Sequence, residues 1–467
     1  MTKQKRARTI GELKASGYQS VTVREEMRRN LIELIKKGEN IFPGIIGYDD
    51  MVIPQIENAI ISGQDIILLG ERGQAKSRLM RLLVNLLDED IPVVKDCEIN
   101  DDPLAPICKQ CRDKVAAEGD ATEIGWLRRE DRYGEKLATP DIAIADLIGD
   151  VDPIKVAEGR YLSDELTIHY GMIPRTNRGI FCINELPDLT ERLQVGLFNL
   201  MEERDIQIRG YRIRLPLDVF LVASANPEDY TNRGRIITPL KDRYGAQIRT
   251  HYPQTTEEEV SIVEMERRQF KEDGLKTYIP QYMKEIIAEV THLARKSADI
   301  NQRSGVSVRV SITNYETILS NAIRRAVKLG EELAVPRISD LPYIDASTTG
   351  KIELESFDDT KEDKVIDELI KKAVLNVFNR YYKIYELEEI VAQFNTGFSV
   401  EVSDSMDARS YVRNVKEMVG LADAIKTVNE SEKPEAIASA VEFILEGLHM
   451  NKRLNKARLE NKTVYRR

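Results

Sequence analysis

The chain has 467 residues, of which 42% are hydrophobic and 31% charged, with one tryptophan and a net charge of −10. This length allows two or three ordinary domains, and the composition is that of a helix-rich globular protein rather than a disordered or fibrous one. The acidic balance excludes a global basic field, so we expect no nucleic-acid partner. No apolar run approaches the roughly 20 residues that cross a bilayer, and no secretory signal is recognised, so we expect a cytoplasmic protein without membrane insertion.

The first half of the chain alternates predicted strands and helices. Continuous apolar runs of strand length occupy residues 65–70, 179–184 and 219–226, and leucines recur between them at helical spacing. Apolar strands that alternate with helices indicate a parallel sheet covered by helices on both faces. We therefore expect an α/β domain over residues 41–255, preceded by a helical extension at residues 1–40.

The second half of the chain is expected to be helical. Two long stripes of apolar residues at helical spacing predict an all-α region at residues 256–350 and a C-terminal helical extension at residues 351–467. Residues 330–364 contain prolines and an acidic stretch and are interpreted as a connection. The basic run at residues 452–467 is interpreted as a solvated tail.

A loop of small and polar residues joins the first predicted strand to the helix after it. It reads GERGQAKS, residues 70–77, and this pattern between a strand and a helix is typical of a phosphate-binding loop. Lys76 supplies charge to the β and γ phosphates, and the Ser77 hydroxyl can ligate magnesium. Ala75 replaces the usual second glycine, and we expect the loop to close if position 75 does not need a positive φ. The predicted nucleotide-binding residues of this segment are Gly70, Glu71, Arg72, Gly73, Gln74, Ala75, Lys76, Ser77 and Arg78.

The second apolar run ends in Asn184 and Glu185, at the position of the acidic tip of a Walker B strand. In such a strand the first acid holds magnesium through water, and the next, a glutamate, orients the attacking water. Glu185 is therefore the predicted catalytic base. Asn184 brings no negative charge, so we expect it to bind magnesium only weakly, through water, and Ser77 and the phosphates to be the main ligands.

The third apolar run ends in Asn226, which is placed to hydrogen-bond the γ phosphate or the attacking water. Three strand tips with phosphate-binding, acidic and amide chemistry in this order resemble the AAA+ ATPase family. The resemblance implies that Asn226 is a first sensor, that Arg243 is an arginine finger reaching a neighbouring subunit's nucleotide, and that Arg309 is a second sensor in a lid. Arginine suits both roles because its charge is permanent and its donors form a fixed fork. Arg233 and Arg235 are alternative candidates for the finger.

Within that family, the chain is similar to the magnesium chelatase ATPase subunit and its MoxR-type relatives. The similarity is carried by FPGIIGYD at 42–49, the cysteine-containing stretch at 97–111, DLIGDVDPIKVAEGR at 146–160, and RGIFCINEL followed by DIQIRGYRIRL. It implies ATP or ADP with Mg²⁺ as ligands, a ring oligomer such as a hexamer, and a helical lid after the α/β domain. It also implies that Ile45, Ile46 and Gly47 flank the adenine, and that residues 159–178 and 206–215 form insert hairpins.

Three of the four cysteines, Cys97, Cys108 and Cys111, are clustered in the sequence, whereas Cys182 lies in an apolar run and is expected in the core. The cluster supplies three thiolates, one fewer than a closed tetrahedral zinc site needs. The fourth ligand would come from Asp96, Asp101, Cys182 or one of the histidines. A loop with unpaired thiols, a zinc knuckle and a redox pair are three open interpretations of this segment.

The sequence thus predicts a ring protein that binds and hydrolyses ATP. Three tasks for it are distinguished: a chaperone-like remodeller with a von Willebrand type A partner, as the MoxR resemblance implies; the motor of magnesium chelatase; and a slowly hydrolysing assembly switch. The long helical C-terminus and Asn184 favour the first task over the second. Asn184 and Ala75 are both compatible with the third.

Overall fold

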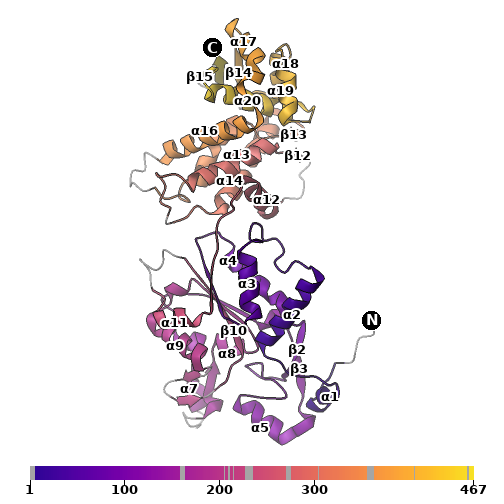
Figure 1. Cartoon of the computed structure of the whole chain (residues 1–467), viewed down its shortest axis with the longest axis vertical. Helices are drawn as coiled ribbons and strands as arrows, with labels where there is room; N and C mark the ends of the chain where they lie inside the picture. Colours follow the sequence, from indigo (N-terminus) through magenta and orange to yellow (C-terminus); the bar gives the residue numbers. More distant parts are fainter. Residues whose placement is uncertain are drawn as a thin grey trace. The chain divides into compact units, whose positions relative to one another are not determined.

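The computed structural model of the chain describes residues 6–467, apart from 158–163, 204–205, 209–210, 214, 227–234, 270–274, 303, 355–361, 404 and 460–461. The chain divides into two compact units, residues 1–251 and 252–467 (Figure 1). Among the helices of the described residues, none combines the length and the apolar character that a membrane span requires.

A five-stranded parallel sheet forms the centre of the first unit. Its order is β11-β1-β10-β7-β4, and all neighbouring strands are parallel. The strands are β1 (Ile66–Leu69), β4 (Tyr133–Leu137), β7 (Gly179–Asn184), β10 (Val219–Ala225) and β11 (Ala246–Arg249). From β1 the chain passes to the far edge at β4, returns through β7 to β10, and then crosses to β11. The carboxyl end of β1 therefore lies at a switch point, where open α/β sheets bind their ligands.

The central strands are buried on both faces, and successive side chains join two different cores. Phe181 and Leu221 pack in the core that includes α9 (Glu191–Glu203) and α11 (Thr238–Arg243). Ile180 and Val222, one residue away on each strand, pack in the core that includes α2 (Val23–Lys37) and α3 (Val52–Ile61). Figure 1 shows these two pairs of helices on opposite sides of the sheet. The predicted parallel sheet with flanking helices is confirmed.

The described N-terminal residues belong to the first unit and contribute to its hydrophobic clusters. Helix α2 begins with a capping box, in which Thr22 and Glu25 hydrogen-bond each other's backbone N–H groups, and it ends at Gly38 in the left-handed conformation. Met27 and Leu31 on this helix are fully buried. Helix α1 (Ile10–Ala15) buries Ile10 and Leu13 in a smaller cluster with Ile124.

Two antiparallel hairpins accompany the sheet of the first unit. Strand β5 (Gly149–Val151) pairs with β6 (Ile168–Tyr170), and β8 (Ile206–Ile208) pairs with β9 (Tyr211–Ile213). The first hairpin therefore starts before the expected segment 159–178, whose residues 159–163 lie outside the described residues, and α8 (Met172–Arg175) follows it. The other elements of this unit are α4 (Lys76–Leu82), a 3₁₀ turn (Leu83–Leu86), β2 (Asp90–Val94), α5 (Lys109–Glu118), β3 (Ile124–Arg128), α6 (Ile144–Leu147) and α7 (Pro153–Ala157).

The second unit is largely helical, and its main hydrophobic core contains residues from Val263 to Tyr465. Its longest helix, α14, is capped by the Ser307 hydroxyl at its start and by Gly330, in the left-handed conformation, at its end. The helices are α12 (Thr256–Glu266), α13 (Gln281–Ala294), α14 (Val308–Leu329), α15 (Asp345–Thr348), α16 (Glu362–Tyr381), α17 (Glu388–Asn395), α18 (Ala408–Val415), α19 (Leu421–Val428) and α20 (Pro434–Met450).

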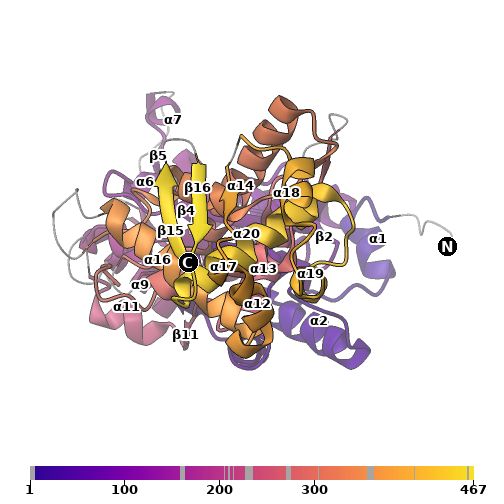
Figure 2. The ribbon, with the colours of Figure 1, turned by 90° about the horizontal axis from the view of Figure 1, so that it is seen from above.

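Two interpretations of the second half are wrong. Residues 330–364 are more than a connection, because a 3₁₀ segment (Ile338–Ile344) buries Leu341 and Ile344 in the core. The basic run at 452–467 is no solvated tail, because β15 (Asn455–Leu459) and β16 (Lys462–Arg466) form the hairpin seen in Figure 2. Strand β14 (Val400–Val402) pairs with β16, and the ring of Tyr465 is buried. This unit also contains the short parallel pair β12 (Lys276–Thr277) and β13 (Leu333–Ala334).

Candidate functional site

The loop between β1 and α4 is tightly packed and has two residues with positive φ. A Cβ atom on Gly70 would lie 1.9 Å from Thr250 Oγ1 and 2.2 Å from Gln74 Oε1, so only glycine fits there. Gly73 has a φ of 78° and Ala75 a φ of 55°. Position 75 therefore does adopt a positive φ, so the condition set for loop closure with alanine is not met. The loop closes with alanine in the left-handed region, at a cost of about 1 kcal/mol relative to glycine.

The Lys76 ammonium group is buried and is held by oxygen atoms of two strand tips. It donates to the backbone carbonyls of Gly70 and Glu71, the latter at 2.8 Å, and to Asn226 Oδ1 at 2.7 Å. Asn226 directly follows β10 and is itself buried. The predicted phosphate-binding lysine and the predicted sensor amide thus lie in direct contact.

A second chain of contacts joins Ser77 to the last residue of β7 and to the middle of β4. The Ser77 hydroxyl donates to Asn184 Oδ1 at 3.2 Å, and the Asn184 amide donates to Glu135 Oε1 at 2.5 Å. Glu135 also forms an ion pair with Arg81, with an Nε–Oε2 distance of 2.8 Å, and this hydrogen bond lowers the pKa of the Glu135 carboxyl. A carboxylate therefore lies beside Asn184, although it belongs to a different strand.

Glu185 is half-buried and has a φ of 56°, in the left-handed region that residues with a side chain rarely adopt. Its backbone N–H donates to the Ser224 hydroxyl at 3.1 Å, and that hydroxyl in turn donates to Asn184 Oδ1 at 3.1 Å. Hydrogen bonds to β10 thus hold the tip of β7 in a strained conformation, a feature that clusters at functional sites.

Tyr48, Thr250 and His251 hold the loop from outside, and no role was predicted for any of them from the sequence. The Tyr48 hydroxyl lies 2.9 Å from the Gln74 carbonyl oxygen and 2.8 Å from that of His251, and burial raises the pKa of Tyr48 to about 12. The Thr250 hydroxyl donates to Gln74 Oε1 at 2.7 Å. The loop is therefore bonded to the segment before α3 and to the last residues of the first unit.

The remaining predicted nucleotide-binding residues surround these contacts. Ile45 is buried in the core beside α3, Ile46 is half-buried, and Gly47 has a φ of 80° directly before Tyr48. In the loop, Arg72 is exposed and Arg78 is half-buried.

The predicted arginines lie on different elements. Arg243, at the end of α11, forms an ion pair with Glu202 and another with Asp242 at 3.3 Å. Arg235 is exposed, and Arg233 lies outside the described residues. Arg309 is exposed on the first turn of α14, in the second unit.

The clustered cysteines are brought together about the start of α5. The three sulfur atoms of Cys97, Cys108 and Cys111 and a carboxylate oxygen of Asp101 all lie within 4.8 Å of one another. Hydrogen bonds from the thiols of Cys108 and Cys111 lower the pKa of Cys97 to about 3. Cys182 is fully buried in β7, as expected for a core residue.

Sequence reasoning missed Glu135, Ser224, Tyr48 and Thr250. Tyr48 lies in the segment FPGIIGYD and Ser224 in an expected strand, so both could have been proposed from their neighbours. Glu135 had no such signal, because β4 reads YGEKL and shows no apolar run.

No family model matches the chain, but it is similar in sequence to magnesium-chelatase subunits. It is 29% identical over 248 residues to subunit ChlI-2 of Arabidopsis thaliana, covering 49% of this chain and 52% of that protein. It is 29% identical over 264 residues to the ChlI subunit of a Nostoc species, covering 55% of this chain and 64% of that protein. A ChlI homolog of Methanocaldococcus jannaschii is 29% identical over 214 residues, covering 44% and 53%. The chain thus spans between about half and two thirds of these relatives.

Solved structures align with the chain more loosely. A complex of the BchI and BchD subunits of magnesium chelatase aligns with 18% identity and a TM-score of 0.36, over 70% of this chain and 98% of that chain. NtrX from Brucella abortus aligns with 14% identity and a TM-score of 0.41, over 83% and 72%. Both scores are low, so the relationship is carried by the sequence matches, which make this chain a distant homologue of the ChlI subunits.

Proposed function

We propose that this chain binds and hydrolyses ATP at the carboxyl ends of β1, β10 and β7. The observation that carries the proposal is the contact between Lys76 and Asn226, which joins a phosphate-binding loop to an amide on the next strand. This arrangement lies at the switch point of the sheet and supplies a cation and an amide for phosphate oxygens. The relationship to ChlI subunits supports the same conclusion.

The residues at this site fit a magnesium ion. Mg²⁺ prefers oxygen ligands, and Ser77 Oγ, Asn184 Oδ1 and the Glu135 carboxylate form a connected set of such atoms. When bound, the ion would neutralise charge on the β and γ phosphates. Ser77 would hold it directly and Asn184 weakly, through water, while Glu135 provides the negative charge that Asn184 lacks. The low pKa of Glu135 means that this charge is present at neutral pH.

Glu185 and Arg243 are the residues we assign to hydrolysis. Glu185 directly follows β7 and would orient the attacking water as its base, and Asn226 would contact the γ phosphate. Arg243 is ion-paired with Glu202, and as an arginine finger it would exchange this partner for the nucleotide of a neighbouring subunit. Hydrolysis would then depend on a ring oligomer, for example a hexamer, with Arg309 as the second sensor.

The cellular task we propose is remodelling of a partner protein that carries a von Willebrand type A domain. The motor of magnesium chelatase is the alternative suggested by the ChlI relatives. A slowly hydrolysing assembly switch is favoured by two observations: the amide of Asn184 in place of an acid, and the strained Ala75. Steady-state ATP turnover separates the switch from the other two. A porphyrin metallation assay with the two other chelatase subunits separates the chelatase from the remodeller.

The test of the proposed site is nucleotide binding and hydrolysis in single variants of the full chain. Lys76→Ala removes the buried charge and is expected to abolish ATP binding in a fluorescent-nucleotide titration. Glu185→Gln keeps the shape of the base and is expected to retain ATP, lower turnover by at least 10²-fold, and favour the assembled ring in light scattering.

Matched controls are available on the surface. Lys37→Ala at the exposed end of α2 and Glu191→Gln at the exposed start of α9 should leave binding and turnover unchanged. Unaltered ATP binding in Lys76→Ala would refute the phosphate-binding assignment. Unaltered turnover in Glu185→Gln would refute only the assignment of the base.

A further inference from the structure

The buried cluster of Cys97, Asp101, Cys108 and Cys111 lies outside the nucleotide site and has the composition of a metal centre. Its three sulfur atoms and one carboxylate oxygen lie within 4.8 Å of one another. Ligands of a tetrahedral zinc ion, at about 2.3 Å for sulfur and 2.1 Å for oxygen, are separated by roughly 3.4–3.8 Å. We propose that these four side chains bind one structural zinc ion.

Asp101 provides the strongest indication of a ligand. Its side chain is fully buried, and among the described residues its Oδ1 atom has no hydrogen-bond partner. The other oxygen, Oδ2, accepts the backbone N–H groups of Ile107 at 3.2 Å and of Cys108 at 3.0 Å. One oxygen is therefore fixed by the backbone while the other remains for the cluster, as in a metal-binding carboxylate that outer hydrogen bonds orient.

The backbone around the sulfur atoms is arranged in the same way. The Asp101 N–H donates to Cys97 Sγ at 3.4 Å, and the Cys111 N–H donates to Cys108 Sγ at 3.4 Å. These bonds stabilise thiolates, which are the form of cysteine that binds metal. Two short turns of backbone, one at residues 97–101 and one at residues 108–111, thus direct their side chains to a common point.

The chemistry of the set selects zinc. Three thiolates and one carboxylate suit a borderline-soft ion in a tetrahedral site, whereas magnesium and calcium prefer oxygen ligands only. All four protein ligands are present and the cysteines are buried or half-buried, so the site is closed and structural rather than catalytic. All four cysteines of the chain are free thiols, so no disulfide competes for these sulfur atoms.

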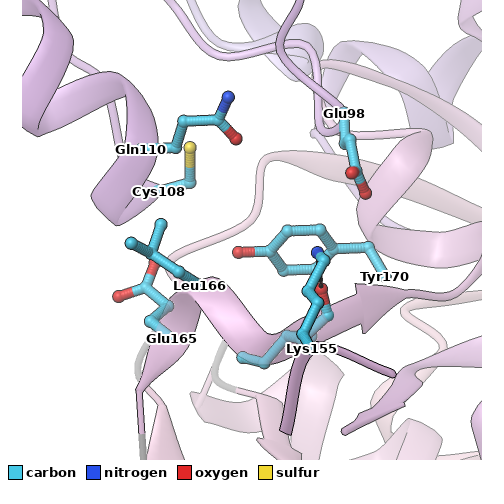
Figure 3. A pocket seen from close by; sticks show the side chains of 8 residues that line it. Glu98, Cys108, Gln110, Lys155, Glu165, Leu166 and Tyr170 are labelled. Carbon is cyan, nitrogen blue, oxygen red and sulfur yellow. Dashed lines mark hydrogen bonds between the residues drawn. The ribbon is translucent and has the colours of Figure 1, made fainter. Parts of the chain in front are cut away.

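A zinc ion here would fix one wall of a hollow on the first unit. Glu98, Cys108 and Gln110 line this hollow together with Lys155, Glu165 and Tyr170. Figure 3 shows Cys108 and Gln110, from the start of α5, on one side of it and Lys155 and Tyr170 on another. Helix α5 is also hydrogen-bonded to the 3₁₀ turn Glu165–Thr167 directly before β6, because the Lys109 N–H donates to Glu165 Oε1 at 2.7 Å. The ion would therefore brace the segment that leads into β6.

The experiment measures zinc in the full chain, purified without chelator, by inductively coupled plasma mass spectrometry. We expect one zinc ion per chain. Exchange with Co²⁺ should give the visible bands of a tetrahedral cobalt site and a thiolate-to-cobalt charge-transfer band. Cys111→Ser should lower the zinc content roughly tenfold or more, whereas Cys182→Ser, which alters a buried cysteine outside the cluster, should leave it at one.

Two variants at the fourth ligand keep the test valid if Cys111→Ser fails to fold. Asp101→Asn removes the charge but keeps the size, and should lower zinc content. Asp101→Cys should retain zinc and strengthen the charge-transfer band through a fourth thiolate. Absence of zinc and of cobalt bands in the folded unmodified chain would overturn the proposal, as would equal zinc content in the Cys111→Ser and unmodified chains. ATP binding is measured separately, so neither result depends on the nucleotide site.

Discussion

Asn184 takes the place of an acidic residue, yet its side chain is not isolated from negative charge. It accepts a hydrogen bond from Ser77 and donates one to Glu135 on the neighbouring edge strand. The register of β4 and β7 aligns Glu135 with Cys182, two residues before Asn184. The Glu135 carboxylate therefore contacts Asn184 from the neighbouring strand, and it also forms an ion pair with Arg81 on α4.

We predict that Glu135→Gln weakens the binding of Mg²⁺ together with the nucleotide while leaving metal-free ATP binding intact. The expected change is roughly a tenfold higher Mg²⁺ requirement, the size typical of losing an outer partner of a metal site. Titration of Mg²⁺ against a fluorescent nucleotide measures it. Adding Asn184→Asp to this variant should return the Mg²⁺ requirement to that of the unmodified chain. Glu123→Gln is the control, because it alters an exposed carboxylate that is paired with Lys95. Identical Mg²⁺ curves for Glu135→Gln and the unmodified chain would exclude this role.

The same carboxylate fixes the expected pH dependence. Arg81 lowers the pKa of Glu135 in the folded chain, so the unfolded chain binds its proton more readily. The contribution of this ion pair to the stability of the fold is therefore fully present above the ordinary pKa of glutamate, about 4.3. This contribution is lost as the pH falls through the lower pKa that Glu135 has in the folded chain. Magnesium dependence should accordingly be flat from neutral pH down to about 5.

At the scale of elements, a glycine of α20 lies directly against an aromatic side chain of α16. Gly447 lies inside α20, and a Cβ atom there would be 1.9 Å from Cδ2 of Phe378 on α16. Phe443, one turn earlier on α20, stacks on Tyr282 of α13 with ring centroids 4.3 Å apart. The absence of a side chain at 447 therefore allows three helices to share one aromatic core.

Gly447→Ala is predicted to destabilise the second unit by about 1–3 kcal/mol through overpacking, although alanine is the better helix former by about 1 kcal/mol. Urea unfolding followed by circular dichroism measures the change. Gly196→Ala, in the interior of α9, serves as the control because its new methyl group would make an ordinary 3.4 Å contact with Ile148. It should be neutral or stabilising. A gain in stability for Gly447→Ala would show that the helices can separate at no cost.

The elements that were predicted correctly are those whose apolar residues follow a clear period or form a continuous run in the sequence. Central strands such as β7 and β10 are buried on both faces and read as continuous apolar runs, and α14 carries a regular apolar stripe. Edge strand β4 and the hairpin of β15 and β16 are only partly buried, so their sequences carry few apolar residues. The fourth residue of the cysteine cluster could not be selected either, because spacing does not tell which aspartate the fold will bury.

At the scale of the whole molecule, each unit has hydrophobic cores made only of its own residues. The chain passes from one unit to the other at His251 and Tyr252. Thr250 and His251, directly before this point, are hydrogen-bonded to Gln74 of the β1–α4 loop and to Tyr48, respectively. The boundary between the units therefore directly follows residues that contact the proposed nucleotide site.

We predict that nucleotide binding changes the distance between the units and that Thr250→Val reduces this change. Valine keeps the volume of threonine but removes the hydroxyl that bonds Gln74. Fluorescence energy transfer between one label on each unit measures the response to ATP. Thr277→Val, at an exposed threonine of β12, should leave the response unaltered. An unaltered change of energy transfer on ATP binding in Thr250→Val would show that this hydrogen bond does not couple nucleotide binding to the distance between the units.

Such a connection works in both directions. Suppose that the β1–α4 loop and the boundary between the units are coupled through Thr250 and His251. A binding partner that favours one arrangement of the units then changes the affinity for nucleotide by a certain factor. Nucleotide must change the affinity for that partner by the same factor. A partner of this protein would then be detectable without knowing its task, as a shift in the dissociation constant for ATP.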